Sequence, residues 1–544
     1  MATMAQRNVL WIMCDQLRFD YLSCTGHPHL HTPNIDRLAA KGVRFSRAYV
    51  QSPICGPSRM SFYTGRYVRS HGATWMGVPM RVGEPTLGGH LNEIGVRNVL
   101  VGKTHMDPDV EGMKRLGIDA DSFIGVRETQ CGFEPYERDD GLVPTAEPGN
   151  PTAYNAYLGK KGYDGDNPWE EWANSGVDED GRLLSGWLLT HADKPARVEE
   201  LDSETPYMTR RAMQFMREAK DDDRPWCLHL SYIKPHWPYI VPAPYHNMFG
   251  VEDIVPALRD ERERDDPHPL YDAYMQMRVS KAFSDDRVRE RVIPAYMGLI
   301  KQIDDQIGLL LDFLEENGLA DNTLIAFTSD HGDYLGDHWL GEKELFHDVS
   351  VKVPLILYDP DPGADATRGT VCDNLVEAID LAPTLLEYFG GEPKPHILEG
   401  RSLMPLIRGE MPASWRDYVI SEYDYAMRKP RTDLNMPVRE CGLVMVTDGR
   451  WKYVHAKSLP PMLFDLQNDP HEYNDLGRDP AYEDERKRLH DVMTRWSLQV
   501  HNRVTITDER IAAIASRDLE NNIPIGYWDE AELEQARREQ GIVK

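Results

Sequence analysis

The sequence predicts an α/β fold in which a large, mostly parallel central sheet is flanked by helices, with a small antiparallel sheet near the C-terminus. Two observations predict this fold class. Short, continuously apolar segments alternate with amphipathic helical segments over most of the chain, which is typical of parallel sheets covered on both faces. Polar residues directly follow several apolar segments, and in open α/β sheets ligands bind at the carboxyl ends of the strands.

Helices are expected between the apolar segments. The clearest one begins with Thr32 as N-cap and Pro33 in the first helical position, and it ends at Gly42. Leu87–Ile94 and Leu310–Glu316 have helical patterns as well. The apolar segments are expected to form five strands of the central sheet, namely Val9–Met13, Asn98–Val101, Trp226–Tyr232, Leu324–Thr328 and Val353–Tyr358.

Length and composition predict more than one domain. The 544 residues exceed what a single core accommodates, so we expect an α/β domain over residues 1–409, a C-terminal α+β subdomain over 410–500 and a helical arm over 501–544. Residues 134–200 are rich in Gly, Asp, Asn, Pro and Trp, and we expect a long insertion there that covers the strand ends as a lid. The short segments expected in the C-terminal sheet are Leu443–Val446, Trp451–Val454 and Leu463–Leu466.

Charge and cysteine content exclude some classes of protein. A net charge of −28 argues against a partner made of nucleic acid or an anionic membrane surface. The apolar run Val9–Cys14 is too short for a signal peptide, and no apolar stretch reaches the roughly 18 residues of a membrane span. Seven cysteines without a C-x-x-C pair are typical of a reducing compartment, so a cytoplasmic location is expected.

Two polar pairs follow predicted strands and offer ligands for a metal ion. Asp15 and Gln16 follow the first strand, and Asp330 and His331 follow the fourth. Either pair alone is more typical of polar residues that simply end a strand or cap a helix. Both pairs at neighbouring strand ends favour one divalent cation, because carboxylates, amides and imidazoles are its ligands. The imidazole favours Mn²⁺ over Ca²⁺, and both remain candidates.

Cationic side chains and histidines follow other strands. Lys103 and His105 are two residues apart on a segment expected to be extended, so both side chains point the same way. His236 lies between prolines after the third strand, and Lys343 lies in a later loop. Together with Arg59, these residues predict a pocket for a tetrahedral oxyanion in which the histidines transfer protons.

Cys55 lies in the segment SPICGPSR, where Gly56, Pro57 and Ser58 predict a tight turn. No second cysteine stands at disulfide or metal spacing. A thiol is a poor nucleophile for this pocket, since its attack on sulfur or phosphorus leaves an intermediate that water hydrolyses badly. The residues alone therefore place Cys55 beside the pocket without giving it suitable chemistry.

The segment Cys55–Arg59 resembles the C-x-P-S-R motif of the type I sulfatases, a family of the alkaline phosphatase superfamily, and Thr64–Arg66 continues the resemblance. It implies an alkaline-phosphatase-like sandwich fold and hydrolysis of sulfate monoesters. Further matches span most of the chain: TPNIDRLAAKGVRF (32–45), GKTH (102–105), KPHWP (234–238), SDHGDYLGDH (329–338), DLAPTLLEYFGG (380–391) and LFDLQNDPHEYNDL (463–476).

The resemblance also implies a chemical change at residue 55. In the family a maturation enzyme oxidises this cysteine to formylglycine (3-oxoalanine), and the hydrate of that aldehyde is the nucleophile. An oxygen of residue 55 then completes a metal shell made by Asp15, Gln16, Asp330 and His331. The carried-over catalytic roles are support of the hydrate by Arg59, binding of sulfate oxygens by Lys103 and Lys343, protonation of the leaving alcohol by His236, and removal of a proton from the second hydroxyl by His105.

The substrate class has two candidates. The Asp-Gln and Asp-His pairs resemble the branch that contains phosphonate monoester hydrolases and choline sulfatases. Phosphonate hydrolases tend to carry Tyr and Thr where this chain has Lys103 and His105. We therefore expect a sulfatase that also accepts phosphonate monoesters and phosphodiesters. The alternative is a phosphonate monoester hydrolase or phosphodiesterase, and a remote alternative is a non-catalytic oxyanion-binding protein.

The expected partners are a small sulfate or phosphonate ester and the formylglycine-generating maturation enzyme. A homo-oligomer, either a dimer or a tetramer, is expected to form through the charged helical arm at residues 501–544.

Overall fold

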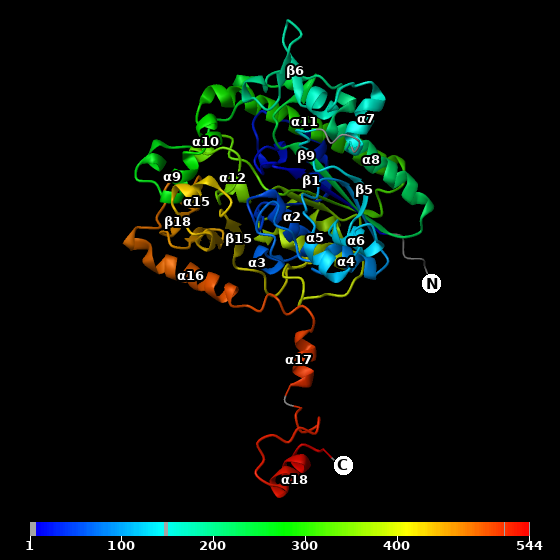
Figure 1. The fold of residues 1–544 in the computed structure, drawn as a ribbon, viewed down its shortest axis with the longest axis vertical. Helices are drawn as coiled ribbons and strands as arrows, with labels where there is room; N and C mark the ends of the chain where they lie inside the picture. Colours follow the sequence, from blue (N-terminus) through cyan, green and yellow to red (C-terminus); the bar gives the residue numbers. More distant parts are fainter. Residues whose placement is uncertain (1–6, 146–150, 516, 543–544) are drawn as a thin grey trace.

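The computed structural model describes residues 7–145, 151–515 and 517–542 (Figure 1). Its central sheet has eight strands in the order β13–β2–β12–β11–β1–β9–β4–β5. All neighbouring strands pair in parallel except β12, which is antiparallel to both β11 and β2. The strands are β13 (Thr370–Cys372), β2 (Val43–Phe45), β12 (Leu355–Tyr358), β11 (Thr323–Ser329), β1 (Asn8–Asp15), β9 (Trp226–Pro235), β4 (Arg97–Gly102) and β5 (Glu134–Arg138).

The central strand β1 shows why this sheet is covered on both faces. Every residue of β1 is buried, and alternate side chains join two different hydrophobic clusters. Trp11 and Met13 pack on one side, whereas Leu10 and Ile12 pack on the other. A strand with two buried faces has a continuously apolar sequence rather than an alternating one. The predicted α/β class with a mostly parallel sheet is confirmed.

Helices form a layer on each face of the sheet. The long helix α11 (Asp286–Glu316) packs with α1 (Pro33–Lys41) and α8 (Glu204–Glu218) on the side of Leu10 and Ile12. The opposite face carries α2 (Cys55–Thr64), α4 (Leu87–Glu93) and α13 (Leu381–Tyr388). Figure 1 shows α11 and α8 on one side of β1 and β9, and α2 and α4 on the other.

A separate four-stranded antiparallel sheet lies near the C-terminus, as predicted. Its order is β15 (Val419–Asp424), β16 (Gly442–Thr447), β17 (Trp451–Ala456) and β18 (Met462–Asp465). Helix α16 (Glu483–Ser497) contacts β16 and β17, and Trp496 and Leu489 join the apolar cluster beneath. The sequence analysis missed β15. The placement of a domain boundary at residue 409 remains a prediction.

Two segments differ from their expected form. Residues 134–138, assigned to the start of an insertion, form the edge strand β5 of the central sheet. Its sequence EPYER is mostly polar because one edge has no neighbour to bury it. The arm contains α17 (Asp508–Ile514) and α18 (Glu530–Glu539) and projects from the body (Figure 1).

Within the described ranges, no helix is long and apolar enough to cross a membrane.

Candidate active site

The predicted site residues converge at the carboxyl ends of four adjacent strands. Asp15 ends β1, and Asp330 follows β11. Lys103 follows β4, and His236 follows β9. Because these strands are parallel neighbours, segments separated by more than 300 residues meet at one edge of the sheet.

Cys55 begins a helix rather than lying in a turn. It is the first residue of α2, and the side chain is completely buried. Gly56 and Pro57 lie in the first helical turn, where proline costs no intrahelical hydrogen bond; this is why turn-forming residues occur in a helix here. The positive end of the helix therefore faces residue 55, and this favours a negative charge on the nucleophile.

Three other side chains surround the Cys55 sulfur and could share a cation with it. The Sγ atom lies 3.0 Å from His331 Nε2 and 3.7 Å from Asp15 Oδ1. His331 Nε2 lies 3.7 Å from Asp15 Oδ1 and 3.7 Å from Asp330 Oδ1. His331 Nδ1 donates to the carbonyl of Gly332, so the lone pair of Nε2 points into the site.

This donor set fits a divalent cation. Ligand atoms from Asp15, Cys55, Asp330 and His331 all lie within 4.8 Å of one another, and all four side chains are buried. Anionic side chains this deep in a protein require compensation by cations, and Arg59 supplies part of it. The charges of Lys103, His236 and Arg59 hold the pKa of Asp15 below its ordinary value although burial alone raises it.

Arg59 holds the two carboxylates in place. Its Nε donates to Asp330 Oδ2 at 2.7 Å, and Nη2 donates to Asp15 Oδ2 at 3.1 Å. Its Nη1 donates to the Lys103 carbonyl and to Ser231 Oγ. Among the described residues, none of its hydrogen bonds reaches Cys55. Its geometry is therefore that of a residue that orients metal ligands.

Two lysines point at the same centre. Lys103 Nζ lies 2.7 Å from Asp15 Oδ2. Lys343 Nζ donates to Cys55 Sγ and to Gln16 Oε1, each at 3.1 Å. Burial raises the pKa of the Cys55 thiol, but the charges of Lys343, His331 and Lys103 outweigh burial and place the pKa well below the ordinary thiol value. The site therefore stabilises negative charge at residue 55.

His236 is oriented by its own backbone. Nδ1 lies 2.6 Å from the Trp237 carbonyl, which can only accept, so Nδ1 carries the proton. Nε2 then accepts from Lys343 Nζ at 3.1 Å. Burial and the charge of Lys343 lower the pKa of His236 to about 4. A bound anionic ester would oppose this shift, because negative charge favours the imidazolium.

His105 contacts Cys55, but not from the extended segment that the sequence predicted. Its φ is 52°, and this turn brings the ring within hydrogen-bonding reach of residue 55. Asp140 holds the turn, since its Oδ1 accepts from the backbone N–H groups of Thr104 and His105 at 2.8 and 2.9 Å. His105 Nδ1 is buried and has no hydrogen-bond partner in the described chain.

The sequence analysis missed three supporting residues. Asp333 accepts from Gln16 Nε2 at 2.5 Å and from Tyr239 Oη at 2.7 Å, and Asp140 and Ser231 hold the segments described above. Asp333 lies in the matched segment SDHGDYLGDH, which was a usable signal. Asp140 had no signal, because it lies where an insertion was expected.

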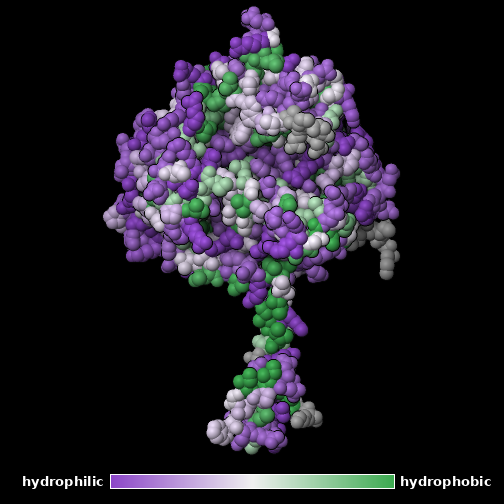
Figure 2. Space-filling model, in the orientation of Figure 1, coloured by the Kyte–Doolittle hydropathy of each residue, from purple (hydrophilic) through white to green (hydrophobic). Residues whose placement is uncertain are grey.

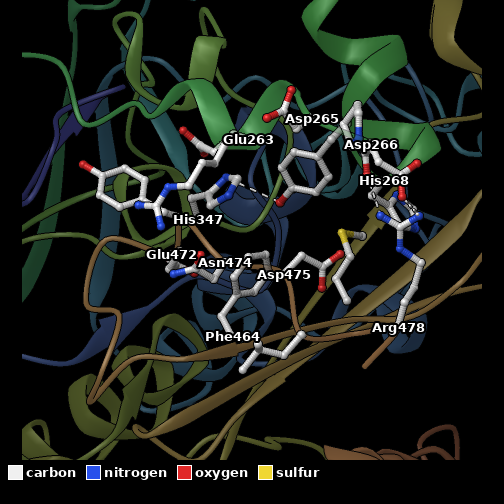
Figure 3. Close-up of a pocket in the computed structure, with 16 residues that line it drawn as sticks. Glu263, Asp265, Asp266, His268, His347, Phe464, Glu472, Asn474, Asp475 and Arg478 are labelled. Carbon is white, nitrogen blue, oxygen red and sulfur yellow. Dashed lines mark hydrogen bonds and ion pairs between the residues drawn. The ribbon is translucent and has the colours of Figure 1, made fainter. Parts of the chain in front are cut away.

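Figure 3 shows a different pocket, with a volume of about 310 Å³, between residues 262–271 and the loop after β18. None of the ten predicted site residues lines it. Glu263 and His347, which line it, belong with His338 to a second cluster of potential metal ligands. The rings of His338 and His347 stack in parallel with centroids 3.7 Å apart, so their nitrogen lone pairs do not converge on one point.

The α/β fold gathers side chains that could hold a divalent cation beside the buried residue 55, and the comparisons identify the family. The sulfatase family model matches residues 7–391, so the chain belongs to the sulfatase family. A second model, described as the C-terminal part of N-sulphoglucosamine sulphohydrolase, matches residues 336–499.

The names of the similar proteins refer to more than one activity. The chain is 33% identical to the multifunctional alkaline phosphatase superfamily protein PehA of Trinickia caryophylli, covering 88% of this chain and 93% of the relative. It is 28% identical to a choline-sulfatase of Rhizobium meliloti, covering 88% and 84%. The phosphonate monoester hydrolase structure from Agrobacterium radiobacter matches with a TM-score of 0.77 and 28% identity, covering 90% of this chain and 95% of that one.

Proposed function

We propose that the protein is a formylglycine-dependent sulfuric ester hydrolase of the arylsulfatase type, with phosphonate monoesters and phosphodiesters as secondary substrates. The observation that carries this proposal is the set of two lysines and a histidine around residue 55. Lys103 and Lys343 face the position where an oxyanion would lie, and His105 contacts the residue 55 side chain. A sulfate monoester, like a phosphonate monoester, presents several anionic oxygens that suit two cations.

Residue 55 is cysteine in the structure, and its Sγ marks the place of the formylglycine oxygen. Formylglycine supplies a hydrated aldehyde, one hydroxyl of which is the nucleophile. When bound, a divalent cation, Mn²⁺ or Ca²⁺, would lower the pKa of that hydroxyl and polarise the ester. The residues that would hold the cation are Asp15, Gln16, Asp330 and His331, together with residue 55.

Side chains of the protein bind the substrate and transfer the protons. Lys103 and Lys343 bind the non-bridging oxygens, and burial strengthens this attraction by excluding water. His236 lies with Nε2 toward Lys343 and donates a proton to the departing alcohol once the bound anion has raised its pKa. His105 accepts a proton from the second hydroxyl of residue 55, for which its unpartnered Nδ1 is available.

The main alternative is a phosphonate monoester hydrolase or phosphodiesterase that uses the same groups. Similarity to two phosphonate monoester hydrolase structures supports this alternative, with identities of 28% and 29%. A non-catalytic oxyanion-binding protein is the remote alternative, and the presence of a competent side chain at every position argues against it.

The two activities are separated by kinetics on matched aryl sulfate, aryl phosphonate and aryl phosphodiester substrates. We expect the highest kcat/KM for the sulfate. A Lys103→Tyr/His105→Thr variant should lower the sulfate-to-phosphonate ratio of kcat/KM by about tenfold or more, because the lysine that binds a sulfate oxygen and the histidine beside residue 55 both leave the site. The control is Lys352→Ala, outside the site. A higher kcat/KM for the phosphonate in the unaltered enzyme refutes the sulfatase assignment.

A further inference from the structure

We infer that the unconverted protein, which carries a thiol at residue 55, is a zinc-binding protein, and that conversion of Cys55 weakens this preference for zinc. The inference rests on the proposed function only in placing residue 55 within the metal shell. The observation that supports the inference is the set of donors, which are the thiol of Cys55, the imidazole of His331 and one carboxylate each from Asp15 and Asp330. Sulfur and nitrogen donors with carboxylates are the ligands of tetrahedral Zn²⁺.

Four of the six separations among the donor atoms are available to compare with a tetrahedron. With metal–ligand distances of about 2.0–2.3 Å, the ligand atoms of tetrahedral zinc lie roughly 3.3–3.7 Å apart. Three measured separations, from Asp15 Oδ1 to Cys55 Sγ and to His331 Nε2 and from His331 Nε2 to Asp330 Oδ1, are 3.7 Å. The fourth, from Cys55 Sγ to His331 Nε2, is 3.0 Å. Cys55 Sγ and His331 Nε2 would have to lie slightly further apart to reach the tetrahedral range.

The carboxylates and the imidazole are already oriented for the ion. Arg59 binds Oδ2 of both Asp15 and Asp330, so each Oδ1 can face the other donors. Asp330 Oδ1 also accepts from the Gln16 backbone N–H at 3.0 Å. His331 donates from Nδ1 to the Gly332 carbonyl, the arrangement that metal-bound histidines adopt on their outer nitrogen. All these side chains are buried, so little ordering is needed when zinc binds.

Conversion changes the chemistry of one donor. Formylglycine presents a hard oxygen where the thiol presented a soft sulfur, and the shell then contains oxygen donors and one imidazole. Replacing the soft donor lowers the affinity for zinc more than the affinity for Mn²⁺ or Ca²⁺, so the preference for zinc becomes smaller. The ratio of zinc to Mn²⁺ affinity should therefore fall when residue 55 is converted. Cys55 would hold zinc through its sulfur as the thiolate, the form of the side chain that binds metals.

The test uses the full chain produced without the maturation enzyme, with the thiol at residue 55 verified by mass spectrometry. Zn²⁺ and Mn²⁺ affinities are measured by competition with a chromophoric chelator, and Co²⁺ is used as a spectroscopic substitute for zinc. The matched control is Cys55→Ser, which exchanges sulfur for oxygen. Circular dichroism and melting temperature verify that both proteins are folded.

We expect the thiol form to bind Zn²⁺ roughly 100-fold more tightly than Cys55→Ser, and Mn²⁺ within about tenfold of it. With Co²⁺, only the thiol form should show an intense thiolate-to-cobalt absorption band. Equal Zn²⁺ affinities, or the same band in Cys55→Ser, would overturn the inference. Because no turnover is measured, this outcome is independent of the sulfatase assay on converted enzyme.

Discussion

Gln16 shows how one side chain of the site is oriented by residues that touch no substrate. Its Nε2 donates to Asp333 Oδ2 at 2.5 Å, so Oε1 is the atom that faces Lys343 and the metal shell. Tyr239 donates to the same carboxylate oxygen, and Asp333 Oδ1 accepts from the Leu335 backbone N–H. Asp333 therefore accepts three hydrogen bonds and determines which end of the Gln16 amide can bind a cation.

The substitution Asp333→Asn tests this positioning role. An asparagine must turn its NH₂ group toward either Gln16 or Leu335, where another donor already lies, so the amide of Gln16 loses its fixed orientation. We expect metal affinity, measured by calorimetry, to fall about 10- to 100-fold. Tyr239→Phe, which keeps the bond between Gln16 and Asp333, is the control and should change affinity less. Unchanged affinity in Asp333→Asn would contradict the role.

The directly acting residues could be predicted from sequence, but their supporting residues mostly could not. Asp15, Asp330 and Lys103 follow apolar strands, and this position can be recognised from the sequence alone. Asp140 supports His105 from a segment about 35 residues away, and only the pairing of β5 with β4 brings them together. The positive φ of His105 likewise has no sequence signal, since few residues other than glycine adopt it and no glycine marks the position.

At the scale of elements, the end of β4 depends on a close approach to β9. Gly102 has a φ of 109°, and a Cβ at this position would lie 2.0 Å from the Ser231 carbonyl oxygen. The same carbonyl accepts from the backbone N–H of Lys103 at 3.1 Å. Gly102 therefore lets the chain pass close to β9 at the point where β4 ends and Lys103 follows.

Gly102→Ala should lose about 3 kcal/mol of unfolding free energy, because backbone strain and overlap with Ser231 act together. The control is Gly95→Ala, where φ is 82° but no atom lies within 4 Å of the added methyl group. This control should lose only about 1 kcal/mol. Urea unfolding followed by circular dichroism measures both, and equal losses would show that the approach to β9 is not the cause.

Strand β15 carries a carboxyl group that makes stability depend on pH. Burial raises the pKa of Glu422 from 4.5 to about 7, against the opposing effect of a hydrogen bond from the Arg69 backbone. The folded state thus binds a proton that the unfolded state releases. Its stabilising contribution is complete below pH 4.5 and is lost as the pH rises through about 7.

Glu422→Gln should remove this dependence while its side-chain oxygen still accepts from Arg69. Between about pH 5 and 8, the unaltered protein should lose up to about 3 kcal/mol more unfolding free energy than the variant. Urea midpoints measured across this range test the expectation. Parallel curves for the two proteins would mean that Glu422 keeps an ordinary pKa.

Elements with two buried faces were the easiest to predict. β1, β4, β9 and β11 are rich in apolar residues, and each was found close to its observed bounds. The edge strand β5 has no such run, because solvent and polar side chains cover its free edge. The start of α2 at Cys55 was mistaken for a turn, since the residues of a first helical turn are also those of loops.

At the scale of the whole molecule, the C-terminal arm exposes apolar side chains that the body of the same chain does not cover. Ile525 and Trp528 are 81% and 91% exposed, and Figure 2 shows hydrophobic residues along the arm. His501, placed in the arm by the sequence analysis, instead contacts Glu399 and Trp496 on the body. We propose that the arm beyond this point joins subunits of a homo-oligomer.

Light scattering on the full chain should give a dimer or tetramer, and a chain ending at Thr505 should give a smaller species. This end point keeps the contacts of His501. Trp528→Ser in the full chain should weaken association, whereas Leu116→Ser, which removes an exposed apolar group from the body, should not. A full chain that is monomeric at micromolar concentration would eliminate the proposal.

The central claim is that formylglycine at residue 55 performs the reaction, and the fraction of converted residue 55 tests it most directly. Samples produced with graded amounts of maturation enzyme are analysed by mass spectrometry of the peptide Ala48–Arg59, and each is assayed on the aryl sulfate. The account predicts that turnover per chain rises in proportion to the converted fraction and vanishes with it. Full turnover in a sample whose residue 55 is entirely thiol would contradict the claim.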